Sequence, residues 1–333
     1  MSNNDKDKNK ESKELKDSSE YIEKYLQETD VSSKVNYTDE NDEDNSESEN
    51  REKVLLKGSE SKKHNFIEFS SDILPLSIFY DEGTKILVRK ADIKEIQAFS
   101  MVNDKFYYDI IDKMNSMIAS CVRIKTPSGE IKSYLNIKDG DRFFLIYLIR
   151  ELTFNKGNNV KRDVECDCGN NVSINMHRDK FNFFEIDDKI KEYFDESEKA
   201  FYFETINDEV FKIAPPTIGI QKSFNDYIIE QIKEKKEVNL SFLKIIPFTL
   251  INRTNISEDG IKKKLKDFQN SDKMDDDSFQ FLNSAIDKML FGIKSVSTTC
   301  DCGIKIEKDF SLPKKVSSLF VKEDAFNKFI KKK

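Results

Sequence analysis

The stretch VECDCGNNVSI at residues 164–174 returns in part as TTCDCGIKIEK at residues 298–308. These two copies of Cys-Asp-Cys-Gly contain four of the five cysteines of the chain. A tetrahedral structural zinc ion takes four thiolates about 2.3 Å from the metal, and chains usually supply them as two knuckles. Gly169 and Gly303 end the two copies, at a place where glycine adopts a left-handed backbone at little cost. The sequence therefore predicts a structural zinc site with the ligands Cys166, Cys168, Cys300 and Cys302.

Two other interpretations of these cysteines stay open. The knuckles can be free of metal, or oxidant can join them by disulfides. The usual zinc knuckle is CxxC, whereas CxC leaves one residue fewer to bring both sulfur atoms to one ion. We expect the chain to be made in a reducing cytosol, which favours metal ligands over disulfides. The fifth cysteine, Cys121, has no such neighbour and is predicted to be a core residue.

The N-terminal part of the chain differs sharply in composition from the rest. Residues 1–50 contain 16 acidic and 7 basic side chains and no Phe, so they have too little apolar surface to offset the chain entropy lost on folding. We expect residues 1–65 to form a disordered acidic tail. Within the tail, residues 19–28 have apolar side chains at helical spacing, which indicates either a short motif that folds on a partner or a solvated segment.

The remaining residues carry 48 basic and 46 acidic side chains, interspersed along the chain. This near-neutral balance provides no basic stripe for nucleic acid. No run approaches the roughly 20 apolar residues that a membrane helix needs, and the first residues do not resemble a signal peptide.

Catalytic motifs are missing from the sequence as well. The chain has two histidines, His64 in the tail and His177, which is predicted to lie at the surface rather than to act as a ligand or base. The sequence has no HExxH, GxGxxG or GxxxxGK[ST] motif. Four thiolates would also leave no position on the metal for a reacting water. We therefore predict that the protein is not an enzyme, and a hydrolase with an unrecognised site would have no candidate residue.

The sequence indicates two similar halves. ILVRKADIKEIQAFSMVN at residues 86–103 aligns with FKIAPPTIGIQKSFNDYI at residues 211–228 at an offset of 125. In each segment a strand ends and a capped helix begins, with Asp92 and Glu95 forming a capping-box pattern in the first. The apolar spacing predicts that the first helix runs from Ile93 to about Ser120. The alternative is that two unrelated segments share this start by chance.

Each half then leads into its cysteine pair in the same order. In the first, a hairpin around Pro-Ser-Gly at 127–129 precedes a buried helix that is capped by Asp141 and ended by Gly157. In the second, an acidic helix start near residue 276 is followed by Gly292 and a strand. We predict an α+β fold of two helix-plus-short-strand halves, residues 66–180 and 181–333, joined by a zinc-ribbon-like four-Cys site.

This order of motifs resembles the baseplate hub and hub-assembly proteins of contractile-tailed phages related to the T-even myophages. The resemblance rests on the segments ILVRKADIKEIQAF (86–99), Cys121-Val122, DGDRFFLIYLIRELTF (139–154), the knuckles and FSLPKKVSSLFV (310–321). It covers residues 73–322, leaves the acidic tail outside, and departs from the family in the CxC spacing.

The resemblance implies a virion-morphogenesis protein, either a subunit of the central hub or a factor that assembles it. It gives the four knuckle cysteines the role of zinc ligands and makes residues 140–150 scaffold, with Arg150 in an exposed salt bridge. The implied partners are other tail and baseplate proteins, with no small-molecule substrate, and the implied location is the host cytoplasm during assembly or the tail baseplate of the virion. A zinc-ribbon nucleic-acid-binding protein is the alternative function.

Overall fold

A computed structural model describes residues 65–154, 160–204, 210–236, 240–269, 276–289 and 291–320. The predictions for the tail, for His64 and for Gly157 lie outside these residues. The described residues of 62–223 and 241–333 belong to one compact unit, and those of 224–240 belong to another. Every strand and most of the helices belong to the first of these units.

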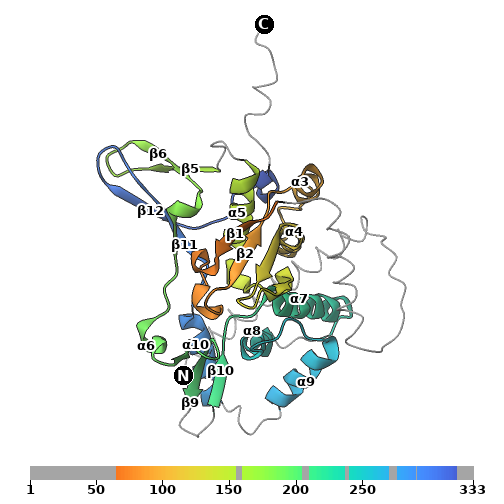
Figure 1. The fold of residues 1–333 in the computed structure, drawn as a ribbon. Coiled ribbons are helices and arrows are strands. Elements are labelled where there is room, and N and C mark those ends of the chain that lie inside the picture. The colour runs from red at the N-terminus through yellow and green to blue at the C-terminus, as the bar shows by residue number, and fades with distance from the viewer. Residues whose placement is uncertain are drawn as a thin grey trace. The chain divides into compact units, whose positions relative to one another are not determined.

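The chain forms a mixture of helices and short strands, as the sequence predicts (Figure 1). The α-helices are α3 Ile93–Ser100, α4 Tyr107–Cys121, α5 Arg142–Thr153, α6 Asp188–Lys191, α7 Ile218–Lys233, α8 Leu240–Thr249, α9 Glu258–Gln269 and α10 Asp276–Lys288. The 3-10 helices are η1 Ser71–Ile73, η2 Ser77–Phe79, η3 Tyr134–Asn136, η4 Asp139–Asp141, η5 Arg178–Lys180 and η6 Val316–Phe320. No helix among the described residues has the length and hydropathy of a membrane span.

Among the described residues the strands form four small sheets, and every pairing in them is antiparallel. The sheet order is β1-β2-β3-β4, β10-β9-β8, β12-β11-β7 and β5-β6. The strands are β1 Ile67–Ser70, β2 Lys85–Val88, β3 Val122–Lys125, β4 Ile131–Lys132, β5 Lys161–Glu165, β6 Asn171–Asn175, β7 Phe181–Phe183, β8 Phe194–Asp195, β9 Ala200–Glu204, β10 Val210–Ile213, β11 Ile293–Thr299 and β12 Lys305–Asp309.

The β2–α3 start has the predicted cap but a shorter helix than predicted. The Asp92 side chain accepts from the backbone N–H of Glu95, and the Glu95 side chain accepts from that of Asp92. The single helix expected to Ser120 is instead two helices, α3 and α4, with Ile93 73% exposed. The connection has a local hydrogen bond, from Lys105 N to Asn103 Oδ1 at 3.2 Å, and a long-range contact, in which Asp104 accepts from the backbone N–H (2.9 Å) and hydroxyl (2.7 Å) of Ser317.

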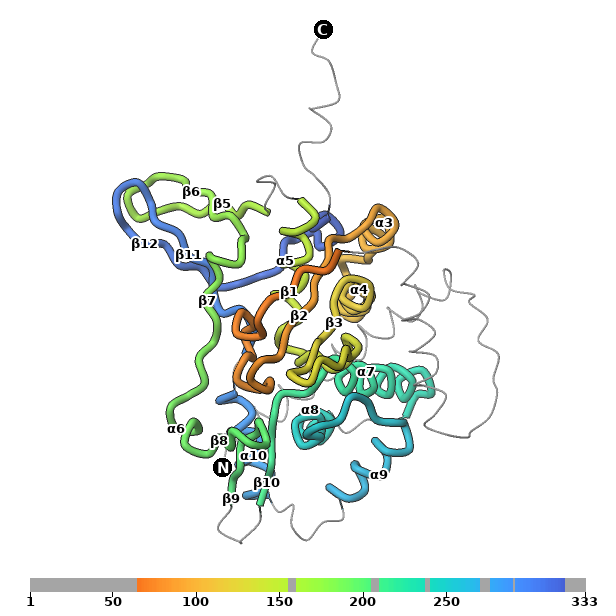
Figure 2. The backbone as a smooth tube through the Cα atoms, viewed as in Figure 1, coloured from red at the N-terminus to blue at the C-terminus, as the bar shows by residue number. Residues whose placement is uncertain are grey.

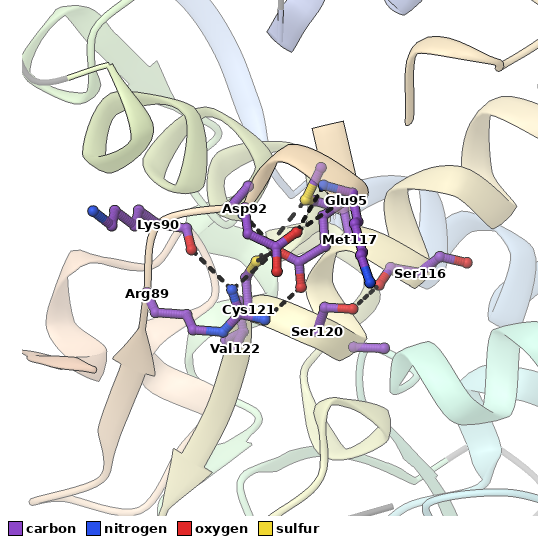
Figure 3. A network of polar contacts seen from close by, with 12 residues as sticks. Arg89, Lys90, Asp92, Glu95, Ser116, Met117, Ser120, Cys121 and Val122 are labelled. Carbon is purple, nitrogen blue, oxygen red and sulfur yellow. Dashed lines mark hydrogen bonds and ion pairs between the residues drawn. The ribbon is translucent and has the colours of Figure 1, made fainter. Parts of the chain in front are cut away.

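Glu95 also ties this start to the end of α4 (Figure 3). Its carboxylate accepts from both terminal nitrogens of Arg89, and Cys121 Sγ lies 3.6 Å from Oε2. Cys121 is fully buried, which confirms it as a core residue. The predicted hairpin after it is confirmed too, as β3 and β4 around Gly129 with a φ of 88°.

Helix α5 is buried almost all round, as predicted, because it packs between α4 and an aromatic cluster. Tyr147 lies 5.3 Å from Phe181 of β7 and 5.8 Å from Phe310, between ring centroids. Arg150 is buried, contrary to the exposed salt bridge we expected; its Nε donates to the Leu319 carbonyl. The helix therefore joins the β2–β3 sheet to the strands beside the cysteines.

Asp141 stands at the N-cap position of α5, so the predicted start of the helix is confirmed, whereas the expected capping bond is absent. Its Oδ1 instead accepts from Leu76 N at 2.9 Å and its Oδ2 from the Tyr80 hydroxyl at 2.6 Å. The residue is fully buried, and it fastens the η2 region to the start of the helix.

The aligned segments have matching element bounds. Strand β2 covers residues 85–88, and β10 covers the aligned residues 210–213. Helix α3 begins at Ile93, and α7 begins at the aligned Ile218. Thr217 Oγ1 accepts from Ile220 N at 3.2 Å, so it occupies the cap position aligned with Asp92. The two starts lie in different sheets, and the division into two similar halves stays a prediction.

Contacts cross the predicted boundary at residues 180 and 181. Strand β11 packs against β6 and η5, and η6 near the C-terminal end packs against α3, where the Phe320 and Phe99 rings are 4.9 Å apart. Figure 2 shows the β5–β6 hairpin beside the β11–β12 hairpin, green beside blue. Segments far apart in sequence thus meet on both sides of α5.

Candidate metal centre

Each cysteine pair forms the tip of an antiparallel hairpin. Strands β5 and β6 pair up to Glu165 and Asn171, and strands β11 and β12 pair up to Thr299 and Lys305. The last pair lies in each case one residue before the first cysteine and five after it. The two hairpins therefore present their cysteines in the same register.

The turns at the two tips have the same hydrogen bonds. In the first, Gly169 N donates to Cys166 O and Cys166 N donates to Asn170 O, both at 2.8 Å. In the second, Gly303 N donates to Cys300 O at 2.8 Å and Cys300 N donates to the Ile304 carbonyl at 2.9 Å. The φ angles of the two glycines are 84° and 85°, so the predicted left-handed position is confirmed in both.

The four predicted ligand residues come together. Cys166 Sγ lies 3.7 Å from Cys302 Sγ, and Cys168 Sγ lies 3.7 Å from Cys300 Sγ. All four sulfur atoms lie within 4.8 Å of one another. Each short distance joins the first cysteine of one hairpin to the second of the other, as in two hairpins related by an approximate two-fold axis.

These distances fit one metal ion. Four bonds of about 2.3 Å to a tetrahedral centre place the sulfur atoms about 3.8 Å apart. The two sulfur pairs that join one hairpin to the other already have about this spacing. Sulfur atoms up to 4.8 Å apart would have to approach each other by about 1 Å. The four sulfur atoms are thiols and not disulfides, whose S–S bond is about 2.05 Å. The CxC spacing therefore does not prevent both sulfurs of a knuckle from reaching one point.

Backbone N–H groups turn toward the sulfur atoms and favour thiolates. The N–H of Cys302 hydrogen-bonds the Cys300 sulfur and lowers the pKa of that thiol to about 7. The N–H of Ile304 likewise lowers the pKa of Cys302, but hydrogen bonds with Cys168 and Cys300 outweigh it and raise the pKa to about 12. Four thiolates repel one another at this distance, so a cation is needed to hold all four deprotonated.

An apolar layer and a polar anchor support the hairpins. Ile174 of β6 and Val296 of β11 are fully buried below the cysteines, and Ile306 of β12 is nearly so. Next to β6, His177 Nε2 lies 3.1 Å from Glu151 Oε2 of α5, and Nδ1 contacts the Asp179 carboxylate. His177 is thus a half-buried anchor; the metal-compatible group of the described residues contains only the four cysteines.

Sequence reasoning found all four sulfur donors and missed the residues that hold the hairpins. Arg162 of β5 donates to the Asp309 carbonyl of β12 at 2.6 Å, and no local pattern marks this bond across 147 residues. No family model, curated protein or solved structure matches the chain.

Proposed function

We propose that the protein is a non-catalytic structural protein of phage tail assembly, with a structural Zn²⁺ ion held by Cys166, Cys168, Cys300 and Cys302. Its place would be the central baseplate hub, as a subunit or as a factor that assembles the hub in the host cytoplasm. The sequence resemblance supplies the class of protein, and the cross-paired sulfur atoms carry the structural role.

The closed set of donors supports a structural ion. Thiolates favour zinc over hard cations such as Mg²⁺ and Ca²⁺. With four sulfur ligands, a tetrahedral ion has no open position for water or substrate. Such an ion would cross-link segments 132 and 136 residues apart, which stabilises a fold made of small sheets.

The two similar halves belong to the same proposal. The identical turns at the cysteines and the aligned starts of α3 and α7 support an internal duplication in which each half contributes one knuckle. The zinc ion would then sit on the axis between the copies.

The charge of the hairpins favours this function over nucleic-acid binding. Residues 160–178 and 293–310 contain six Lys or Arg and six Asp or Glu. Asp167 and Asp301 are exposed at the very tips, where they would repel a phosphate backbone.

Metal analysis of protein purified without chelator tests the ion. We expect one zinc per chain, and loss of zinc together with hairpin structure in the Cys166→Ser/Cys302→Ser double variant. Cys121→Ser is the matched control, because this buried cysteine lies outside the cluster, and it should retain the zinc. Well under one equivalent in the wild type would refute the ion.

Co-expression with the products of neighbouring genes tests the hub role. A tagged chain should retain baseplate proteins through gel filtration, and its deletion should give aberrant tails. Normal infectious particles without the chain would refute this role, whatever the metal content. Binding to duplex DNA at about 50 mM salt, weakening steeply as salt rises, would favour the nucleic-acid alternative.

A further inference from the structure

A cavity of about 430 Å³ lies in the same unit and shares no residue with the metal centre. Its lining residues belong to five segments: 79–84 before β2, 124–138 from β3 to just after η3, 197–199 before β9, 215–217 before α7, and the loop 250–254 after α8. Its size is within the range of about 300–1,000 Å³ of small-molecule sites.

Hydrogen bonds fix these walls against one another. Ile218 N donates to the Ile137 carbonyl at 2.7 Å, and Asp139 N donates to Pro216 O at 2.9 Å. Thr254 Oγ1 donates to Asn136 Oδ1 at 2.9 Å, which closes the loop after α8 onto η3. The cavity is therefore formed by ordered segments that are bonded together at its rim.

Cationic groups outnumber anionic ones in the lining. Four basic residues line it, against two acidic residues, Asp81 and Glu198. Lys199 pairs with Glu196 at 2.7 Å, and Lys132 lies 3.8 Å from Glu130. The side chains of the other two, Lys138 and Arg253, have no hydrogen-bond or ion-pair partner among the described residues.

Lys138 is a half-buried cation of the cavity lining. Burial lowers its pKa, and the charges of Asp141 and Asp81 oppose this effect without contacting the nitrogen. An anion bound in the cavity could pair directly with this ammonium group.

The lining also offers groups that donate to oxygen. Thr84 and Asn252 line the cavity beside the cations. Lys199 and Asn252 have positive φ angles of 52° and 60°, and they are two of three such non-glycine residues in the described chain. Backbone strain of this kind collects at binding sites.

From the unpartnered cations and the polar lining of one preformed cavity, we infer a binding site for a small organic anion, a phosphate ester or a carboxylate. Lys138, which is half-buried, supplies one positive charge, and Arg253, which is exposed, supplies a second charge and a two-pronged donor. The site is independent of the metal ion and of the hub role.

Isothermal titration of the full chain tests the site with glycerol 3-phosphate, with succinate, and with glycerol as the neutral control. We expect one of the two anions to bind at about 50 mM salt with a Kd of ~1 mM or tighter, and glycerol not to bind. The better anion identifies the chemical class.

Lys138→Met and Arg253→Gln should each weaken binding ~10-fold or more, while Lys244→Gln should not change it. Lys244→Gln is the control because it removes the same charge from a surface ion pair with Asp287, and Lys244 does not line the cavity. If Lys138→Met fails to fold, Arg253→Gln decides, since its side chain is exposed. No heat from either anion at ~10 mM, or equal affinity in wild type and variants, would overturn the inference.

Discussion

Replacing Asp141 by Asn should change how stability depends on pH. Burial raises the pKa of the Asp141 carboxyl from its ordinary value to about 7, and bonds from Tyr80 and Leu76 oppose the rise only in part. In the unfolded chain the pKa is about 3.9. The folded state therefore binds the proton more tightly. The stability that Asp141 contributes is complete below about pH 4 and is lost as pH rises toward 7.

The expected magnitude follows from the two pKa values. Between pH 5 and pH 8 the free energy of unfolding of the wild type should fall by about 3 kcal/mol, which corresponds to about two pKa units at this carboxyl group. Asn cannot ionise, and at pH 5 the variant should be less stable by about 1 kcal/mol because its single carbonyl oxygen replaces two acceptors: if it accepts from Leu76 N, the NH2 group facing the Tyr80 hydroxyl cannot accept from it. At pH 8 the order should reverse, with the variant more stable than the wild type.

Urea unfolding at pH 5 and pH 8 measures this crossover as the difference between variant and wild type at each pH. Effects of metal release cancel in that difference, because both proteins retain the cysteines. Asp112→Asn on the exposed side of α4 is the matched control for loss of a carboxyl group at the surface. A pH-independent difference for Asp141→Asn, within about 0.5 kcal/mol, would mean that the buried carboxyl is already charged at pH 5.

Three further predictions concern the metal, a close approach and a thiol. Chelation of the metal at neutral pH should lower the unfolding temperature, and zinc should restore it; an unchanged temperature in protein shown to be metal-free would exclude a stabilising ion. Gly219→Ala should destabilise the fold by several kcal/mol, since its Cβ would stand 2.0 Å from the Thr254 carbonyl oxygen. In the control, Gly129→Ala, the new Cβ has open space around it and should cost only the strain of the positive φ. Urea unfolding measures both variants. Burial raises the pKa of the Cys121 thiol well above its usual range, so iodoacetamide should label it only after unfolding, and rapid labelling of the native protein would contradict its buried position.

Local patterns predicted the parts of the structure that depend on neighbouring residues. The capping box at Asp92, the Pro-Ser-Gly hairpin and the two glycine turns each need only a few consecutive residues, and all are present. The four cysteines could be grouped because metal chemistry needs four donors, whatever their separation.

Long-range contacts decided what the sequence did not predict. In the connection between α3 and α4, Asp104 binds Ser317, 213 residues away, a contact that no helical periodicity can indicate. Asp141 resembles a capping residue in the sequence, but its buried carboxylate accepts a hydrogen bond from the Tyr80 hydroxyl instead. The cavity escaped prediction for the same reason, since Lys138 and Arg253 belong to segments with no shared pattern.

The cross-pairing of the cysteines has a consequence for synthesis. Cys166 and Cys168 leave the ribosome long before the sulfur atoms that complete their site, which lie 132 and 136 residues later in the chain. At about 5–20 residues per second this leaves two exposed thiols waiting for several seconds. Neither hairpin can close a four-sulfur site alone, so the nascent chain would acquire its ion only after the second hairpin emerges. Failure of that late step would leave an early knuckle open to oxidation or to pairing with another chain.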